Sequence, residues 1–335
     1  MTNLKMDPKI NSKNVAQARN TVHEAFGTLP VPERCYCVLM SPRSGSTLLC
    51  THLQNIKYGY PIEAFHFSHN RLRRLYGWDI DFADPFTHMK KALDFQTVNG
   101  IFGTKFSWIE FELFLKAARK LTDSSGIQLN DAELVDVFFP NTVYIHLKRK
   151  NKVKQAISYA KAMQNGIWHV QAEQAVDNKA YALPEEYNRE HIEACLDNLL
   201  AFDVAWENYL QRHNLPFMEL WYEDLAKDYQ GKMHEIYAYL GIEQEQLSAP
   251  PLKKLANTES QEWVNRFTAE TPWLENKTIV NALETGDVST AFIYRMMLLT
   301  REKERKGWAN IPVNRFRLKS IKLMLSRLKR KLRLS

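Results

Sequence analysis

The stretch from Tyr36 to Thr47, which reads YCVLMSPRSGST, decides the fold. Its first five residues form a short apolar run that Ser41-Pro42 ends, a pattern typical of a buried parallel strand. The residues from Arg43 to Thr47 are rich in Ser and Gly and lead into the apolar start of a helix at Leu48-Leu49. A strand, a small-residue loop and a helix in this order predict a layered α/β structure with this loop at the carboxyl end of a strand.

The same alternation of short apolar runs and helical segments continues along the chain. Further strands are predicted where Val, Ile, Phe and Tyr are concentrated, at Ile101–Phe106, Thr142–Leu147 and Pro216–Trp221. Helices are predicted between and around them, at Thr47–Asn55, Phe111–Leu121, Val153–Gln164 and Arg189–Arg212. We therefore expect an α/β fold with a mostly parallel sheet flanked by helices, and ligands at the carboxyl ends of its strands.

Composition excludes several classes of protein. The chain has 335 residues, of which 45% are hydrophobic and 25% charged, as in ordinary globular proteins and unlike disordered or fibrous ones. Its net charge of +7 comes from residues 313–335, where there are nine basic residues and no acidic one. The rest of the chain is close to neutral, so a generally basic nucleic-acid-binding surface is not expected.

The cysteines and the apolar segments indicate a cytoplasmic protein. The chain has four cysteines, Cys35, Cys37, Cys50 and Cys195. They form no CxxC pair and have no His at zinc-ligand spacing, so we expect buried, reduced thiols. The N-terminus lacks the apolar region of a signal peptide, and the apolar stretch Ala291–Thr300 is interrupted by Arg295 and too short to span a bilayer.

The loop after the first strand has the composition of an anion site. A helix N-terminus presents unpaired backbone N–H groups and the positive end of the helix dipole, and both favour a phosphate-type anion. Gly45 allows the backbone to approach closely, and Arg43 adds a permanent charge. The hydroxyls of Ser44, Ser46 and Thr47 can donate hydrogen bonds. The alternative is a Ser/Thr-capped turn that binds nothing.

This loop is not a Walker A sequence, because GxxxxGK[ST] would require Gly at Met40 and Lys at Ser46. The missing lysine, with no evident Asp for Mg²⁺, weighs against ATP or GTP hydrolysis. A basic residue before Ser-Gly-Ser-Thr instead resembles the 5′-phosphosulfate loop of sulfotransferases that use 3′-phosphoadenosine 5′-phosphosulfate (PAPS). The resemblance implies that Arg43 and residues 44–47 hold the phosphosulfate of the donor.

A second landmark of sulfotransferases is an Arg after a central strand and a Ser on the next helix, which together hold the donor's 3′-phosphate. Arg149 follows the predicted third strand, and Ser158 ends a Gln-Ala-Ile-Ser tetrapeptide. This tetrapeptide, with Gln164 and Trp168, resembles the trehalose 2-sulfotransferase family of bacteria. The resemblance implies that Arg149 and Ser158 bind the 3′-phosphate. The alternative for Arg149 is a solvated charge, which is what we expect of its neighbours Lys150, Lys152 and Lys154.

More of the chain resembles this family. Residues 58–65 (YGYPIEAF) are similar to its Gly-Glu-Pro-Gln-Glu-Phe-Phe segment, which implies that Glu63 is the general base. Other similar segments are 103–108 (GTKFSW), 221–225 (WYEDL), 256–257 (AN) and 262–266 (EWVNR). Two departures, Tyr60 for a carboxylate and Ile62 for Gln, put trehalose itself in doubt as the acceptor. Residues 258–259 replace a Gln and an Arg, which puts one donor contact in doubt.

Sulfuryl transfer sets the chemical requirements of such a site. The enzyme must align the reactants, neutralise the charge that grows on the leaving phosphate, and take a proton from the acceptor hydroxyl. We expect Arg43 to neutralise the charge and Glu63 to take the proton. His66 and His69 could line the acceptor site or be an exposed pair, and Lys105 could reach the sulfonate or be a surface charge. No metal is needed, and no metal cluster is expected.

We expect three regions, an N-terminal extension (1–34), a sulfotransferase domain (35–275) and a helical C-terminal extension (276–335). The last region ends in a predicted helix of which one face is apolar and the rest basic; the apolar face consists of Leu318, Ile321, Leu325, Leu328 and Leu332. A basic amphipathic helix suits an anionic membrane surface, here the inner face of the membrane. The alternatives are a helix packed on the body, the seam of a homodimer, or contact with nucleic acid.

The sequence therefore favours a PAPS-dependent sulfotransferase that acts on a hydroxyl, or an amine, of a carbohydrate, glycolipid or small metabolite. A kinase-like enzyme is opposed by the missing Walker lysine. The alternative from another class is a non-catalytic nucleotide- or anionic-lipid-binding protein on the same scaffold.

Overall fold

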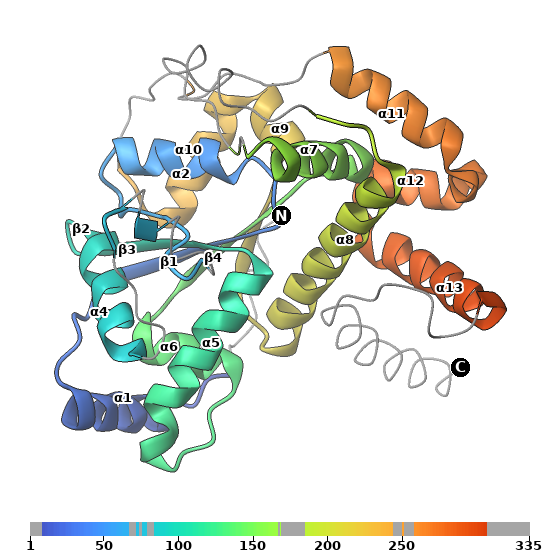
Figure 1. Cartoon of the computed structure of the whole chain (residues 1–335). Coiled ribbons are helices and arrows are strands. Elements are labelled where there is room, and N and C mark those ends of the chain that lie inside the picture. Colours follow the sequence, from blue (N-terminus) through green and yellow to red (C-terminus); the bar gives the residue numbers. More distant parts are fainter. Residues whose placement is uncertain are drawn as a thin grey trace. The chain divides into compact units, whose positions relative to one another are not determined.

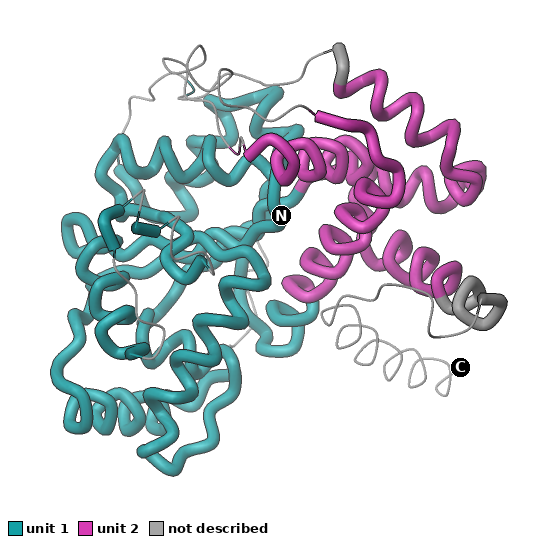
Figure 2. Tube along the Cα trace, in the orientation of Figure 1, with its two compact units in different colours: residues 1–148, 171–173, 208–253 teal, residues 149–170, 174–207, 254–335 magenta. Residues whose placement is uncertain are grey.

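The computed structural model describes residues 9–66, 72–73, 76–78, 84–166, 168, 185–243, 250 and 258–306, with the backbone alone for 258–259 and 300–306. The chain divides into two compact units (Figure 2). Unit 1 comprises residues 1–148, 171–173 and 208–253, and unit 2 comprises residues 149–170, 174–207 and 254–335. The predicted helix at 313–335 lies outside the described residues.

Unit 1 is built on a five-stranded sheet in the order β2-β3-β1-β4-β5. Its strands are β1 (Arg34–Met40), β2 (Thr97–Val98), β3 (Ile101–Phe106), β4 (Val143–Lys148) and β5 (Phe217–Trp221). All neighbours pair in parallel except the short edge strand β2, which is antiparallel to β3. The predicted α/β fold with a mostly parallel sheet is confirmed, and the four predicted strands agree with β1, β3, β4 and β5 to within two residues.

Helices cover both faces of this sheet (Figure 1). Unit 1 contains α1 (Ser12–Phe26), α2 (Ser46–Asn55), α4 (Pro85–Gln96), α5 (Trp108–Thr122), α6 (Asp131–Phe138), α9 (Tyr222–Lys227) and α10 (Tyr229–Leu240), with a short 3₁₀ helix at Asp123–Ser125. Helix α5 begins at Trp108, three residues before the predicted start, because Ser107 and Glu110 form a capping box that extends it. The N-terminal extension belongs to this unit, since the Arg19 side chain of α1 donates a hydrogen bond to the Val137 carbonyl of α6 at 2.8 Å.

The strands are buried on both faces, so their residues alternate between two cores. On one face, β1 packs against α2 and α10 through Tyr36, Val38, Met40, Leu49, Leu53, Met233 and Ile236. On the other, aromatic rings of β3 and α5 stack with the residues after α6. The ring centroids of Phe102 and Phe139 are 4.4 Å apart, and those of Phe106 and Phe114 are 5.5 Å apart. Cys35, Cys37 and Cys50 are free, buried thiols of this unit, as predicted, and Cys195 is one in unit 2.

Unit 2 is helical. It contains α7 (Lys152–Asn165), residues 189–207 of α8 (Arg189–Arg212), α11 (Thr258–Glu270), a 3₁₀ helix (Pro272–Glu275), α12 (Lys277–Thr285) and α13 (Val288–Lys306). The predicted helices at 153–164 and 189–212 are confirmed as α7 and α8. The apolar core of unit 2 includes Ile157, Leu196, Leu199, Phe267, Ile279 and Phe292. Among the described helices of the whole chain, none combines the length and the apolar character that crossing a bilayer requires.

A buried ion pair lies inside this helical core. The ammonium of Lys152 on α7 pairs with the carboxylate of Asp203 on α8, and both side chains are wholly buried. The Lys152 Nζ atom is also 3.1 Å from the side-chain oxygen of Gln155. The expectation that Lys152 is a solvated charge is therefore wrong, because the partner carboxylate on α8 compensates for its removal from water.

The Lys152–Asp203 pair predicts a large effect of removing one partner. Asp203→Ala should lower the free energy of unfolding by about 3–5 kcal/mol, because it leaves the ammonium buried without its carboxylate. The exposed pair Lys90–Asp94, with N–O distance 2.8 Å, supplies the control, and Asp94→Ala should cost at most about 1 kcal/mol. Urea unfolding of both variants measures the difference; equal effects would contradict the assigned role of Asp203.

Candidate active site

The loop between β1 and α2 has an unusual backbone. Arg43 has φ +65° and Gly45 has φ +87°, so left-handed residues alternate with ordinary ones along the loop. Such alternation turns successive backbone N–H groups toward one concave side, which is a favourable geometry for binding an anion. Gly45 is required for a second reason, since a Cβ atom there would lie 2.4 Å from the Tyr222 ring of α9.

The start of α2 combines a glycine N-cap with a buried hydroxyl. Gly45, the N-cap residue, makes no side-chain capping hydrogen bond. Ser44 is fully buried, and its Oγ atom has no hydrogen-bond partner among the described residues. A buried hydroxyl without a partner costs free energy unless a ligand or water satisfies it. The loop therefore offers the Ser44 hydroxyl where the sequence predicted an anion site, and Arg43, half-buried, belongs to the same loop.

A segment beside β3 positions Glu63. Ile62 forms a parallel bridge with Thr104 of β3, and its carbonyl accepts a hydrogen bond from the backbone N–H of Lys105 at 3.2 Å. Phe65 then fixes the following turn by packing against Phe106, with ring centroids 5.7 Å apart. Glu63 therefore lies at the end of an added strand-like segment, beside the carboxyl-terminal part of β3.

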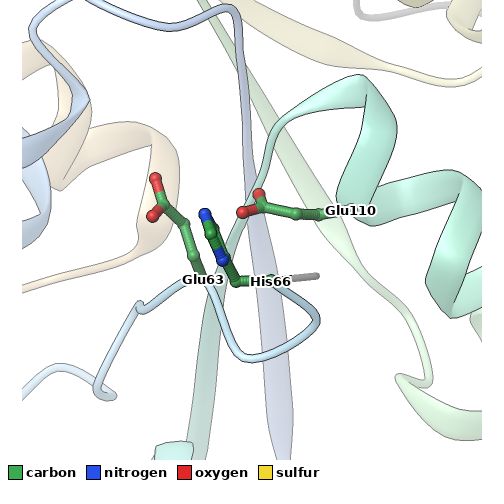
Figure 3. Close-up of side chains that lie close together, drawn as sticks. All are labelled: Glu63, His66 and Glu110. Atoms are coloured by element: carbon green, nitrogen blue, oxygen red, sulfur yellow. The ribbon is translucent and has the colours of Figure 1, made fainter. Parts of the chain in front are cut away.

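Glu63, Lys105, His66 and Glu110 form a cluster at this edge of the sheet. The Nζ atom of Lys105 lies 3.4 Å from Oε1 of Glu63, and both side chains are largely buried. A carboxylate oxygen of Glu63, a ring nitrogen of His66 and a carboxylate oxygen of Glu110 all lie within 4.8 Å of one another. Figure 3 shows these three side chains converging, the first two from the 62–66 segment and Glu110 from the first turn of α5. The sequence prediction included Glu63, His66 and Lys105, and the structure brings them together; His69 lies outside the described residues.

Glu110 is a member of the cluster that the sequence analysis missed. Its Oε2 atom accepts a hydrogen bond from the backbone N–H of Ser107 at 2.8 Å, as the third helical residue of a capping box does. Burial, followed by the charge of Glu63, raises the pKa of Glu110 to about 8. The Ser-x-x-Glu pattern at 107–110 was visible in the sequence, but by itself it indicates only the start of a helix.

The charges of this cluster favour proton transfer over metal binding. Two carboxylates and an imidazole are groups that divalent metals accept as ligands. The Lys105 ammonium, however, already lies beside Glu63, and a second cation there would be repelled. A carboxylate beside a lysine, near a second carboxyl group whose pKa is raised to about 8, is suited to accept a proton from a bound hydroxyl.

Arg149 and Ser158 belong to unit 2, of which the structure is described separately from that of unit 1. Arg149 directly follows β4 and is half-buried, and Ser158 is half-buried in the middle of α7. Asn151 caps α7 by accepting a hydrogen bond from the Lys154 backbone N–H at 2.8 Å. The Gln164 side chain makes two hydrogen bonds of 2.9 Å with the backbone of Glu186. Lys154 is exposed as predicted, and Lys150 is half-buried.

Two curated relatives are similar to this chain over most of their length. The chain is 27% identical over 266 residues to trehalose 2-sulfotransferase of Mycobacterium tuberculosis (strain ATCC 35801 / TMC 107 / Erdman), a match that covers 72% of this chain and 97% of the relative. It is 28% identical over 255 residues to trehalose 2-sulfotransferase of Mycolicibacterium smegmatis (strain ATCC 700084 / mc(2)155), covering 69% and 93%.

A solved structure, the sulfotransferase domain of the olefin synthase of Synechococcus PCC 7002, matches with a TM-score of 0.30 and 17% identity over 89% of this chain and 95% of that chain. A model of the Stf0 sulphotransferase family matches residues 35–270. Since that match extends over most of the chain, this protein belongs to the Stf0 sulphotransferase family.

Proposed function

We propose that this sulfotransferase moves the sulfuryl group of PAPS to a hydroxyl, or an amine, of a carbohydrate, glycolipid or other small metabolite. The observation that carries the proposal is that one unit of a family member holds two features together. One is a Ser/Gly-rich loop before α2, whose buried Ser44 hydroxyl has no partner among the described residues, and the other is the carboxylate of Glu63, paired with Lys105. The first of these features suits an anionic donor, and the second suits deprotonation of an acceptor.

The residues of the loop fit the phosphosulfate end of the donor. The Ser44 hydroxyl and the N–H groups at the start of α2 would donate hydrogen bonds to it, and Arg43 would supply a fixed positive charge. Thr47 and Ser46, in the first turn of α2, would add hydroxyl donors. Family resemblance assigns Arg149 and Ser158 to the 3′-phosphate. ATP lacks a phosphate at that position, so these two residues would select the donor.

The reaction needs one proton acceptor and one site of charge stabilisation. The acceptor oxygen forms a bond to sulfur while the bond between sulfur and the bridging phosphate oxygen breaks. The phosphate oxygen keeps the electron pair of the broken bond. The proton of the acceptor passes to Glu63. Arg43 and the backbone N–H groups of residues 45–47 stabilise the charge on the leaving phosphate. Lys105, beside Glu63, is positioned to interact with the sulfonate or to hold the carboxylate, and His66 would line the acceptor side.

The acceptor is proposed as a class rather than as one sugar. Both relatives named above are trehalose 2-sulfotransferases, which favours a carbohydrate hydroxyl. At two positions where the family segment has a carboxylate and a Gln, this chain has Tyr60 and Ile62. Tyr60 packs edge-on against Phe95, with ring centroids 5.2 Å apart, and Ile62 is buried beside β3. These positions cannot supply the family's carboxylate and amide, so trehalose itself is not proposed.

A screen of acceptors with labelled PAPS tests the activity directly. Transfer of label to a sugar, glycolipid or small metabolite would support the enzyme, and donor binding without transfer to any of a broad set would favour the non-catalytic alternative. A cytoplasmic location and a single domain at residues 35–275 stay predictions.

Donor choice is the first prediction of this function. 3′-Phosphoadenosine 5′-phosphate should raise the thermal midpoint of the protein more than ATP with Mg²⁺ does, because only the former carries the 3′-phosphate assigned to Arg149 and Ser158. Arg149→Ala should remove most of that stabilisation, whereas the neighbouring Lys150→Ala should leave it within a few fold. A thermal shift series with both nucleotides measures this; equal stabilisation by ATP would contradict the donor.

The second prediction separates donor binding from chemistry. Glu63→Gln should lower kcat by roughly 10²-fold or more while the donor affinity changes only a few fold, because a general base is lost and the loop is untouched. Glu33→Gln is the matched control, since Glu33 is exposed and directly precedes β1, at the opposite end of the sheet. Normal turnover of Glu63→Gln would move the base to another residue, with His66 the first to test.

The third prediction concerns residues 313–335. If they contact anionic lipid, their deletion should abolish sedimentation with phosphatidylserine vesicles, and binding by the full chain should weaken as salt rises. Activity on a soluble acceptor should survive, because none of the proposed site residues lies beyond Ser158. Full-length protein that does not bind vesicles, or a truncation that converts a dimer to a monomer, would instead indicate packing or a homodimer seam.

A further inference from the structure

Glu110 is a buried titratable group that the proposed reaction does not use. It lies in the first turn of α5 with 3% of its surface exposed, and it belongs to the cluster with Glu63 and His66. The capping hydrogen bond to Ser107 occupies its Oε2 atom. A Gln at this position would serve the cap equally well, since capping boxes accept Glu or Gln. The cap therefore does not explain why a carboxyl group lies here.

The number of charges around Glu110 indicates a bound proton. Glu63 and Glu110 place two carboxyl groups in one buried cluster, whereas Lys105 supplies one ammonium, and it lies beside Glu63. Two carboxylates so close together, with one ammonium beside only Glu63 and solvent largely excluded, cannot both be ionised without a large electrostatic cost. The cost is lowest when the carboxyl group away from the lysine keeps the proton.

We propose that Glu110 is a positioning residue that holds a proton at neutral pH, so that Glu63 stays the ionised partner and is held toward the acceptor. This inference rests on the proposed role of Glu63 as the base. A protonated Glu110 donates a hydrogen bond that an ionised one cannot, and its ionisation would place a second negative charge next to the anionic sulfuryl group.

Several other groups face this pair and enter its pH dependence. Lys105 projects from β3, and His66 lies in the same turn as Glu63 (Figure 3). The Cys50 thiol of α2 also interacts with Glu63 and Lys105, and burial raises its pKa to about 12, so it stays neutral over the range tested. The backbone N–H of Ser107 donates to Glu110 and opposes protonation, but burial and Glu63 outweigh it.

Stability measurements test the proton without any substrate. A carboxyl group whose pKa is raised from 4.5 to about 8 on folding binds more protons in the folded than in the unfolded state between those two pH values. Its contribution to the free energy of unfolding therefore falls as pH rises from about 4.5 to about 8 and is constant above. In Glu110→Gln this group no longer titrates, so its part of the fall in the free energy of unfolding with rising pH disappears. The ratio of this variant's folding equilibrium constant to that of the parent protein should rise at least about tenfold between pH 5 and pH 8.

Combining Glu110→Gln with a second substitution tests whether this pH-dependent rise comes from the Glu63–Glu110 pair. In a Glu63→Gln background the rise should shrink, because the charge that helps to raise the pKa of Glu110 is gone. In a His66→Asn background it should persist. No pH-dependent difference in the parent background, or one that His66→Asn abolishes, would overturn the proposal. Because these measurements need no activity, they remain decisive even if the protein transfers no sulfate, an outcome that would reject only the proposed function.

The pH–rate profile tests positioning. With an acceptor in hand, kcat of the parent protein should fall above about pH 8, and Glu110→Gln should keep its neutral-pH activity within a few fold and move that alkaline limb up by at least about one pH unit. Glu133→Gln is the matched control, since Glu133 is also the buried third residue of a capping box, on α6, and should leave the profile unchanged. An unchanged limb in Glu110→Gln, or a uniform loss at all pH values, would reduce Glu110 to a structural residue.

A metal titration tests whether a metal cation, rather than a proton, occupies the Glu63–His66–Glu110 cluster. Zn²⁺ and Mn²⁺ alone should not raise the thermal midpoint of the parent protein relative to Glu110→Gln. Stabilisation that Glu110→Gln abolishes would mean that a cation, rather than a proton, balances the carboxylates, and the proposal would fall.

Discussion

The parallel pairing of β1 with β3 and β4 is the constraint on which the candidate site depends. Its register places Val38 opposite Lys105 and Leu39 opposite His146, so that three neighbouring strands end at the same edge of the sheet. The loop before α2 and the Lys105 ammonium thereby reach one edge from segments about sixty residues apart in the chain. Parallel strands require long crossovers, and those crossovers carry the helices whose N-termini face a ligand. The loop proposed to bind the donor and the cluster that contains the proposed base both follow from this one topology.

The two parts of the site are held by different kinds of local constraint. The loop depends on Gly45, where a left-handed backbone and the adjacent Tyr222 ring leave no room for a side chain. The cluster depends on hydrogen bonds, because the Ile62 carbonyl aligns the 60–63 segment with β3 and the Ser107 cap fixes Glu110. A rigid backbone on one side and fixed carboxyl groups on the other suit the proposed in-line transfer, since reacting atoms must be aligned before the bond to sulfur breaks.

The parts of this structure that follow from local pattern could be predicted from the sequence, and the parts that depend on distant partners could not. Apolar runs predicted β1, β3, β4 and β5, and the Ser/Gly-rich motif around Arg43 predicted a loop that joins a strand to a helix. Lys152 was misjudged because its burial depends on Asp203, which is 51 positions away. Glu110 was missed because its local pattern indicates a helix cap, and only the folded structure brings it near Glu63. Glu63 and Lys105 were each predicted as site residues, but their mutual contact was not.

The cluster also shows how a residue can serve folding and function at once. A capping box needs an acceptor at the third helical position, and either Glu or Gln satisfies it. Glu133 is the acceptor in the capping box of α6 and is not part of the Glu63 cluster, whereas Glu110 is the acceptor in the capping box of α5 and lies near Glu63. The same hydrogen bond to a backbone N–H then has a different consequence, because burial beside a second carboxylate makes one of the two a proton store. Position within the fold, rather than residue type, turns a helix cap into a group that can govern a base.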